Sequence, residues 1–494
     1  MKTKRTLALV VVPLTLILSI LACSGGKAAT PTAEPQPSAT AVIIEEPTEK
    51  PVVPTARSAK ATATVESAQP TQEISSSGSA DCDAVTDGKL GVAYVSGYVD
   101  TLDSLRVIGM VCNKTSEDVT SIVLTVEVFD KNEKSLYKDE NVYTALGNVA
   151  AGEDTPFSLS IYETLTDPDT VKATITSSET ARLKRATVDT QGVVTTVDDQ
   201  GNLHITGELV NNGSEPVEIH GVAAATFDKD GKMFTADYAS VLIHYLSPTV
   251  DGPFRITMYG PKDGADTLDR YTLYFDVETT DKQDFLIDAE KDLSDLNGYV
   301  DNYGEFHLVG EITNNGSENV GARLVATIYD KDNNVIDAAS MDTPISAIKP
   351  GEIIPYEFNF WGPLDSKKGL YDDKADRYSV QVDPTWTWTT KTELLELKTQ
   401  NDKNNWDEYQ GTFSGQVLND TGGDLDSAVV IVGVYGKKGQ PDADKLVAMG
   451  YSYADITGTL ANGKTADYTV YVPIPKDFNI DNYEYDVLAK GKQP

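Results

Sequence analysis

A motif built on one glycine, one asparagine and one aromatic residue recurs four times in this chain of 494 residues. Each copy is a Gly-x-aliphatic-x-Asn segment, followed about sixteen residues later by an aromatic residue and usually an aspartate. The glycines are Gly109, Gly207, Gly310 and Gly415, so successive copies begin 98, 103 and 105 residues apart. A period of this length corresponds to one small domain. The sequence therefore predicts four related domains in tandem.

The segment before each motif asparagine alternates between apolar and polar residues. In the second copy one face carries Leu203, Ile205, Gly207 and Leu209. Such alternation is typical of a strand with one buried face, and a glycine in the buried row predicts that a large side chain from the opposite sheet covers it. About seven such segments per hundred residues, separated by turns, predict an all-β fold of four immunoglobulin-like sandwiches after a disordered tether.

The first 22 residues predict a leader for export. A basic start at Lys2, Lys4 and Arg5 precedes an apolar run too short for an ordinary membrane span. Its end, Leu21-Ala22-Cys23, resembles the lipobox of bacterial lipoproteins. That resemblance implies cleavage before Cys23, lipidation of Cys23, and anchoring of the protein to the cell membrane or outer membrane at the cell surface. The alternative is a plain secretory signal with an incidental cysteine.

Residues 23–80 are rich in Ala, Thr, Pro and Ser and contain no aromatic residue. Such a segment buries too little apolar surface to offset the loss of chain entropy, so we expect a disordered tether. The predicted domains then follow as four sandwiches, which we call repeats 1 to 4: residues 81–185, 186–282, 283–389 and 390–494.

Charge restricts the partners of the chain. The formal net charge is −35, and it becomes −38 when the three basic residues of the leader are removed. This field repels nucleic acid and anionic lipid head groups. The partners that we expect are the membrane, through the lipid anchor, together with envelope proteins or cell-wall polysaccharide.

Three cysteines occur in the chain. With Cys23 lipidated, Cys82 and Cys112 remain, and in an oxidising compartment we expect them to form a disulfide rather than free buried thiols. The strand that contains Cys112 is apolar on both faces, because Ile108 and Met110 lie on its second face. We expect the segment around Cys82 to cover that face.

The repeated features resemble the FxLYD family of bacterial immunoglobulin-like domains. Repeat 3 fits best, with Tyr329-Asp330, Pro350-Gly351 and the aromatic strand from Tyr356 to Phe358. Repeat 4 departs most, because Gly436 replaces the aspartate. The resemblance implies exported, membrane-attached proteins without a shared catalytic activity.

No catalytic or cofactor motif stands out in the chain, so we expect neither an enzyme nor a cofactor. His204 and His307 precede their motif glycines by three residues, and this equivalence favours a structural or solvent-facing role over a metal site. The segments that begin at Asp228 and Asp330 resemble half of a calcium loop but lack its closing glutamate, so we interpret them as turns.

Two tryptophans, Trp386 and Trp388, are separated by one residue in an extended segment. If exposed, they predict a surface for stacking on sugar rings. We favour the alternative that they pack at the junction of repeats 3 and 4. The Asn-x-Ser/Thr triplets that begin at Asn113, Asn212, Asn315 and Asn419 are interpreted as turns rather than glycosylation sites.

Overall fold

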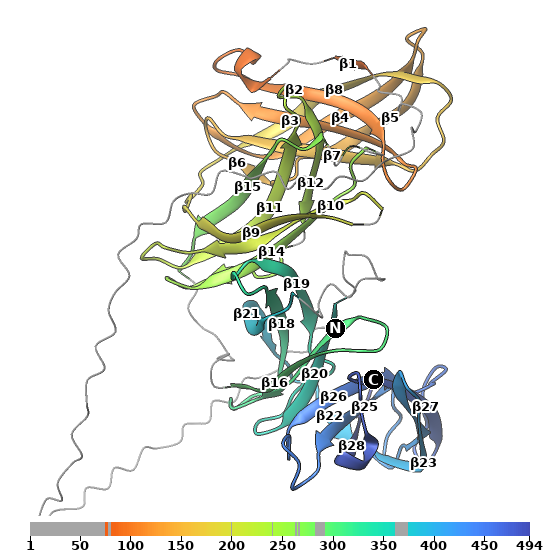
Figure 1. Ribbon diagram of the computed structural model, residues 1–494. Coiled ribbons are helices and arrows are strands. Elements are labelled where there is room, and N and C mark those ends of the chain that lie inside the picture. The colour runs from red at the N-terminus through yellow and green to blue at the C-terminus, as the bar shows by residue number, and fades with distance from the viewer. Residues whose placement is uncertain are drawn as a thin grey trace, which may run out of the picture. The chain divides into compact units, whose positions relative to one another are not determined.

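The structure is a computed structural model that describes residues 75–77 and 81–494 except 199, 240, 262–263, 265–266, 282–291 and 361–373. The predicted leader, Cys23 and most of the predicted tether lie outside the described residues. Apart from two 3-10 turns, η1 (Cys82–Ala84) and η3 (Ile480–Asn482), every named element of the described residues is a β-strand (Figure 1). None of the helices in this described part is long and apolar enough to cross a membrane. The all-β prediction is confirmed.

Repeat 1 contains two sheets. One has the order β2-β3-β7 and is formed by β2 (Leu90–Val99), β3 (Leu105–Asn113) and β7 (Asp154–Ile161). The other is formed by β8 (Pro168–Ala181), β4 (Asp118–Asp130), β5 (Ser135–Tyr143), the short β6 (Asn148–Val149) and β1 (Ser75–Ser77). The three residues of β1 come from the segment predicted as a tether, and they pair in parallel with β8.

Repeat 2 follows the same plan. The first sheet has the order β14-β10-β9, with strands β14 (Asp251–Met258), β10 (Leu203–Val210) and β9 (Asp189–Val197). In the second sheet β11 (Val217–Phe227) pairs with β12 (Met233–Ala239), β13 (Tyr245–Leu246) and β15 (Arg270–Thr279).

Repeats 3 and 4 each contain two further sheets. Repeat 3 has β16-β17-β20 and β19-β18-β21, with strands β16 (Leu293–Val300), β17 (Phe306–Thr313), β20 (Ile353–Phe360), β19 (Val335–Asp342), β18 (Val320–Tyr329) and β21 (Arg377–Thr389). Repeat 4 has β23-β24-β27 and β22-β28-β25-β26, with strands β23 (Lys398–Trp406), β24 (Gln410–Leu418), β27 (Thr465–Pro473), β22 (Leu394–Glu396), β28 (Tyr483–Lys492), β25 (Ser427–Gly436) and β26 (Leu446–Tyr453).

Each motif glycine lies under an aromatic ring. A Cβ atom on Gly207 would lie 2.8 Å from Cζ of Phe254, and one on Gly310 would lie 2.4 Å from Oη of Tyr356. The covering aromatic residue is the cross-strand partner of the glycine in the same sheet. The expectation that it comes from the opposite sheet was therefore wrong, because an aromatic side chain on a neighbouring strand can fold over the space that glycine leaves.

The motif asparagines hold the turn that follows their strand. Asn211 is fully buried, and its Nδ2 atom donates to the carbonyl oxygens of Glu215 at 2.9 Å and Leu246 at 3.0 Å. Its Oδ1 atom accepts from the backbone N–H of Gly213 at 3.0 Å. The side chain thus pairs polar backbone groups that would otherwise be left unsatisfied. The same bonds recur at Asn113, Asn314 and Asn419, so all four motif asparagines hold the turn after their strand in the same way.

The predicted disulfide joins Cys82 to Cys112. Cys82 and Val85 belong to a buried cluster that covers Ile108 and Met110 on the second face of β3. The segment around Cys82 therefore covers the second face of β3 as predicted, but it forms only part of that cover. The same cluster includes residues of repeat 2, namely Ala225, Phe227, Met233 and Ala236.

Candidate functional sites

The aromatic residue of the repeated motif contacts the preceding repeat. The hydroxyl group of Tyr329 in repeat 3 donates to the carboxylate of Glu208 in repeat 2. In the same way, the hydroxyl group of Tyr435 in repeat 4 donates to Oε1 of Glu311 in repeat 3 at 3.0 Å. Glu208 and Glu311 each directly follow their motif glycine. The two contacts are therefore equivalent.

The equivalent positions at the junction of repeats 1 and 2 are apolar and belong to one buried cluster. Phe227 occupies the aromatic position and Met110 follows the glycine, and both lie in the buried cluster that covers β3. Where the preceding repeat offers methionine the aromatic residue is phenylalanine, and where it offers glutamate the aromatic residue is tyrosine. We call this contact, at all three junctions, the joint. The paired residue types keep the joint chemically matched, since a buried carboxylate needs a hydrogen-bond donor and a methionine does not.

Two of the joints share further contacts. The hydroxyl group of Tyr98 donates to the carbonyl oxygen of Tyr259 at 3.1 Å, and that of Tyr299 donates to the carbonyl oxygen of Pro473 at 2.9 Å. A β-bridge lies beside each contact, Asp100 with Pro261 and Asp301 with Pro475. The junction of repeats 1 and 2 and that of repeats 3 and 4 are thus built on the same plan.

A positively chargeable side chain lies three residues before the motif glycine in repeats 1 to 3. These side chains belong to Arg106, His204 and His307. Each is buried and faces an aspartate of the preceding turn, at 3.4 Å (Asp100), 3.1 Å (Asp198) and 3.3 Å (Asp301). Neither histidine faces solvent, so burial excludes the solvent-facing role that was one of the two expected for them.

The charges around this position differ between the repeats. Near His204, the guanidinium group of Arg255 pairs with Asp337 of repeat 3 at 2.8 Å. The cross-strand register places Glu357 of repeat 3 where repeat 2 has Arg255. Oε1 of Glu357 lies 2.9 Å from Nδ1 of His307. Repeat 3 thus carries a carboxylate where repeat 2 carries a cation.

His307 lies in a cluster that the sequence pattern did not predict. The ligand atoms of Asp301, Glu305 and His307 lie within 4.8 Å of one another, a grouping that is able to hold a metal ion. We call these three residues the His307 cluster. The equivalence of the repeats did not predict this cluster. The sequence does show, however, that repeat 3 has Glu357 at the position where repeat 2 has Arg255.

Burial alone would lower the pKa of His307, but the neighbouring carboxylates of Asp301 and Glu357 outweigh that effect and raise its pKa to about 9. Burial lowers the pKa of His204, since only Asp198 opposes it strongly and Arg255 adds a nearby positive charge. The pKa of His307 therefore lies above the ordinary value for histidine, whereas the pKa of the equivalent His204 lies below it.

The half calcium loops act as turns. Oδ1 of Asp228 accepts from the backbone N–H groups of Asp230 and Lys232, both at 2.9 Å. Asp330 makes the equivalent bonds to Asp332 and Asn334. These carboxylates are used to hold the backbone of the turn, which confirms the interpretation from the sequence.

The two tryptophans lie on β21. Trp388 occupies the space above Gly321, where a Cβ atom would be 2.4 Å from its ring. Trp386 is 45 % exposed, the guanidinium carbon of Arg323 lies 4.3 Å from its ring centre, and its ring lies 5.6 Å from that of His244 in repeat 2. The expectation of packing at the junction of repeats 3 and 4 was wrong for Trp386, which contacts repeat 2 instead.

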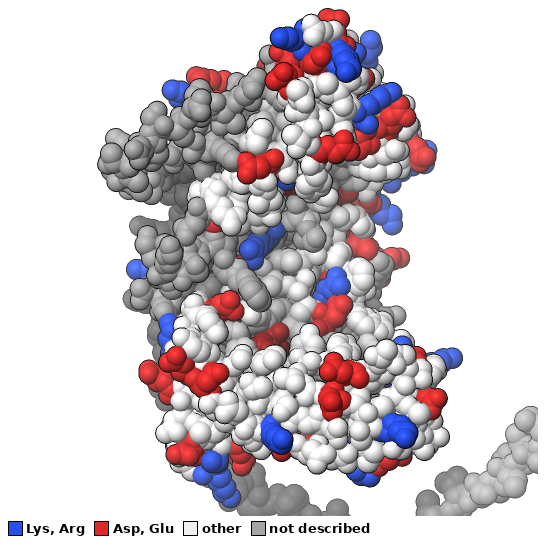
Figure 2. All heavy atoms as spheres, turned by 90° about the vertical axis from the view of Figure 1, so that its right-hand side faces the viewer, with Lys and Arg blue, Asp and Glu red and all other residues white. Residues whose placement is uncertain are grey.

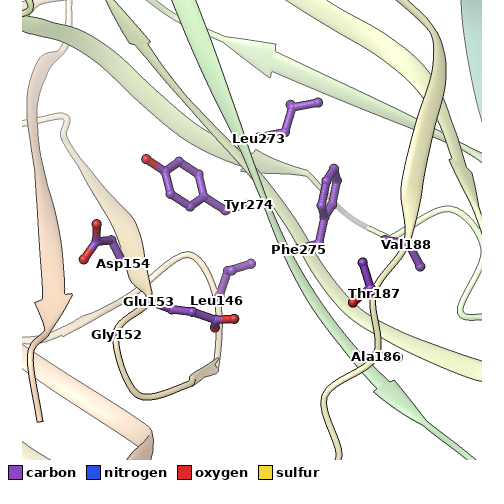
Figure 3. A pocket seen from close by; sticks show the side chains of 10 residues that line it. All are labelled: Leu146, Gly152, Glu153, Asp154, Ala186, Thr187, Val188, Leu273, Tyr274 and Phe275. Atoms are coloured by element: carbon purple, nitrogen blue, oxygen red, sulfur yellow. The ribbon is translucent and has the colours of Figure 1, made fainter. Parts of the chain in front are cut away.

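A groove of about 410 Å³ lies between repeats 1 and 2 (Figure 3). Tyr274 extends to the side of its strand where Asp154 lies, and Phe275 to the side where Thr187 and Val188 lie. Burial raises the pKa of the Asp154 carboxyl group and raises the pKa of Tyr274 to about 12. The ten lining residues include neither histidine nor cysteine, and their polar side chains are the carboxylates of Glu153 and Asp154 and the hydroxyl groups of Thr187 and Tyr274.

On the face drawn in Figure 2, acidic side chains are spread over the surface and interspersed with lysine and arginine. No protein-family model matches the chain, and no curated protein matches it in sequence.

Proposed function

We propose that the chain is a non-catalytic surface protein, anchored by lipid at Cys23, whose four FxLYD-like immunoglobulin sandwiches act as spacer and interaction modules. The observation that carries the proposal is the joint, which recurs at all three junctions with matched residue pairs. Matched joints resist bending between neighbouring modules, and a spacer needs that property.

The interaction role falls to exposed strand edges and loops, because a rigid scaffold commonly presents its binding residues there. Pull-down of the full chain from its native envelope tests this role, and specific recovery of an envelope protein is the expected result. Failure to enrich any envelope component over a chain-free control argues against an interaction role.

Anchoring is tested by substitution of the predicted lipidated residue. We expect the Cys23→Ser variant to appear in the soluble fraction after cell lysis, because it lacks the acyl chains that hold the protein at a bilayer. The unaltered chain should sediment with membranes. A Cys23→Ser variant that still sediments with membranes would contradict the lipid anchor.

A second candidate function is binding of cell-wall polysaccharide. It is favoured by Trp386, which exposes nearly half of its surface beside the guanidinium group of Arg323. Co-sedimentation with insoluble cell-wall polysaccharide should then weaken in Trp386→Ala. The matched control is Tyr162→Ala, which removes an aromatic side chain that is 83 % exposed in repeat 1. Equal binding by both variants and the parent chain would exclude Trp386 as the sugar contact.

A further inference from the structure

The His307 cluster combines three oxygen and nitrogen ligands at a largely buried position. Asp301 and His307 are 2 % and 0 % exposed, and Glu305 is half-buried. His307 lies on β17, and the two carboxylates lie in the turn that connects β16 to β17. A hairpin turn and the strand that follows it therefore supply all three side chains.

Each of these side chains is oriented by a second group. Nδ1 of His307 lies 2.9 Å from Glu357, and Nδ2 of Asn359 donates to Oε2 of Glu305 at 3.2 Å. Oδ1 of Asp301 accepts backbone N–H bonds from Tyr303 and Glu305 at 2.8 and 2.9 Å. Metal ligands in proteins are characteristically held in this way, with a histidine donating its other ring nitrogen to a carboxylate.

The ring nitrogen of His307 opposite Glu357 faces the turn of the cluster. Nε2 of His307 is buried and has no hydrogen-bond partner among the described residues. It lies 3.3 Å from Oδ2 of Asp301, the oxygen that the turn does not use. Buried polar atoms are normally paired. The unpaired ring nitrogen therefore points to a ligand between the side chains of the cluster.

Charge also favours a cation at this position. Asp301, Glu305 and Glu357 are three carboxylates around one imidazole, and no described lysine or arginine forms an ion pair with any of them. In repeat 2 the position of Glu357 belongs to Arg255. Among its described residues, repeat 3 thus has a carboxylate where its neighbour has Arg255, and the excess negative charge is costly in a buried place unless a cation balances it.

We propose that Asp301, Glu305 and His307 bind one divalent transition-metal ion of the Zn²⁺ class, with Glu357 and Asn359 as supporting residues. A set of one imidazole and two carboxylates suits zinc better than the all-oxygen sets that calcium and magnesium prefer. Water completes the coordination. The ion lies beside the junction of repeats 3 and 4, where Asp301 bridges to Pro475.

The test uses the full chain, stripped with a chelator and dialysed against Zn²⁺ in the presence of excess Ca²⁺. The calcium occupies the exposed carboxylates, so that bound zinc reports a nitrogen-containing site. We expect one zinc per chain by elemental analysis. Glu305→Gln and His307→Gln should each lower zinc affinity by about tenfold or more, because each removes a ligand, and Glu357→Gln should lower it by about 10- to 100-fold through loss of support.

His204→Gln is the matched control, because it changes the equivalent histidine in repeat 2, and it should leave zinc affinity unchanged. Circular dichroism of each variant establishes that it is folded. Glu305→Gln should disturb folding least, because Glu305 is only half-buried. Absence of zinc binding by the parent chain would overturn the proposal and assign Nε2 of His307 to a proton. Equal binding by the parent chain, Glu305→Gln and His307→Gln would also overturn it.

Discussion

At the scale of single residues, the motif glycine and its aromatic partner show how strongly the repeats constrain their sequences. Gly207 is covered by Phe254, which is 2 % exposed, and a Cβ atom there would also lie 2.8 Å from Val193. The ring has no room to move away because it is held in a close-packed core. Glycine is required here for close approach.

We therefore expect Gly207→Ala to destabilise repeat 2 by about 1–3 kcal/mol, the usual cost of overpacking a core. Chemical denaturation followed by tyrosine fluorescence measures the change. Gly147→Ala is the control, since the nearest atom to its added Cβ would be 3.9 Å away. Equal stability of the Gly207→Ala variant and the parent chain would show that the ring adapts.

A second prediction at this scale concerns Glu208. Burial raises its pKa, and the hydrogen bonds from Tyr329 and Gln191 only partly oppose that effect. Because the pKa of Glu208 is higher in the folded protein than in the unfolded chain, the folded protein is favoured when Glu208 is protonated. This contribution to stability is complete below the unfolded pKa of about 4.3, and it is lost as the pH rises through the folded pKa. Glutamine at this position stays neutral and keeps an acceptor for Tyr329.

The stability of Glu208→Gln relative to the parent chain should therefore increase between pH 4 and pH 7. Calorimetric melting at the two pH values measures this difference. Glu215→Gln, at an exposed position of the same repeat, should show no comparable increase. A difference between Glu208→Gln and the parent chain that does not change with pH would show that Glu208 ionises normally in the folded protein.

At the scale of elements, the strands were predictable and the joints were not. Alternation along residues 203–209 predicted a strand that the structure places at β10 (Leu203–Val210). The same pattern could not show that Tyr329 crosses to Glu208, because period-two alternation separates two faces but does not name what covers the outer one. The His307 cluster was missed for a related reason. Alternation does not show that Asp301 and Glu305 of the turn come within 4.8 Å of His307, and the supporting residue Glu357, fifty residues away, is brought to His307 only by strand pairing.

The joint leads to a prediction about paired side chains. Tyr329→Phe removes the hydroxyl donor from the buried carboxylate of Glu208, so we expect a loss of about 1–3 kcal/mol in the stability of the adjoining repeats. The double variant Tyr329→Phe/Glu208→Met copies the residue types of the first joint and should recover part of that loss. Urea denaturation of the two variants measures both effects. A double variant that is less stable than Tyr329→Phe alone would contradict the equivalence of the joints.

At the scale of the whole molecule, the buried cores are not all separate. The core cluster of β3, β4 and β7 contains residues of repeat 1 only, whereas one cluster spans repeats 3 and 4 from Tyr299 to Ala489. Shared apolar burial couples the unfolding of neighbouring modules, because exposure of one side removes the cover of the other. Repeats 3 and 4 should therefore unfold together.

One core substitution in repeat 4 and one in repeat 1 test this coupling. Val430→Ala in β25 and Val107→Ala in β3 each remove methyl groups from a fully buried site, at a cost of the order of 2 kcal/mol. Hydrogen exchange measured peptide by peptide should show faster exchange throughout repeats 3 and 4 for Val430→Ala. For Val107→Ala it should be faster in repeat 1 and in the strands of repeat 2 that share the buried cluster around Met110, with repeat 4 unchanged. Protection of repeat 3 that stays unchanged in Val430→Ala would mean that the shared cluster does not couple the two modules. The junction of repeats 3 and 4 would then be a contact between independently stable domains, and only the joint residues would limit bending there.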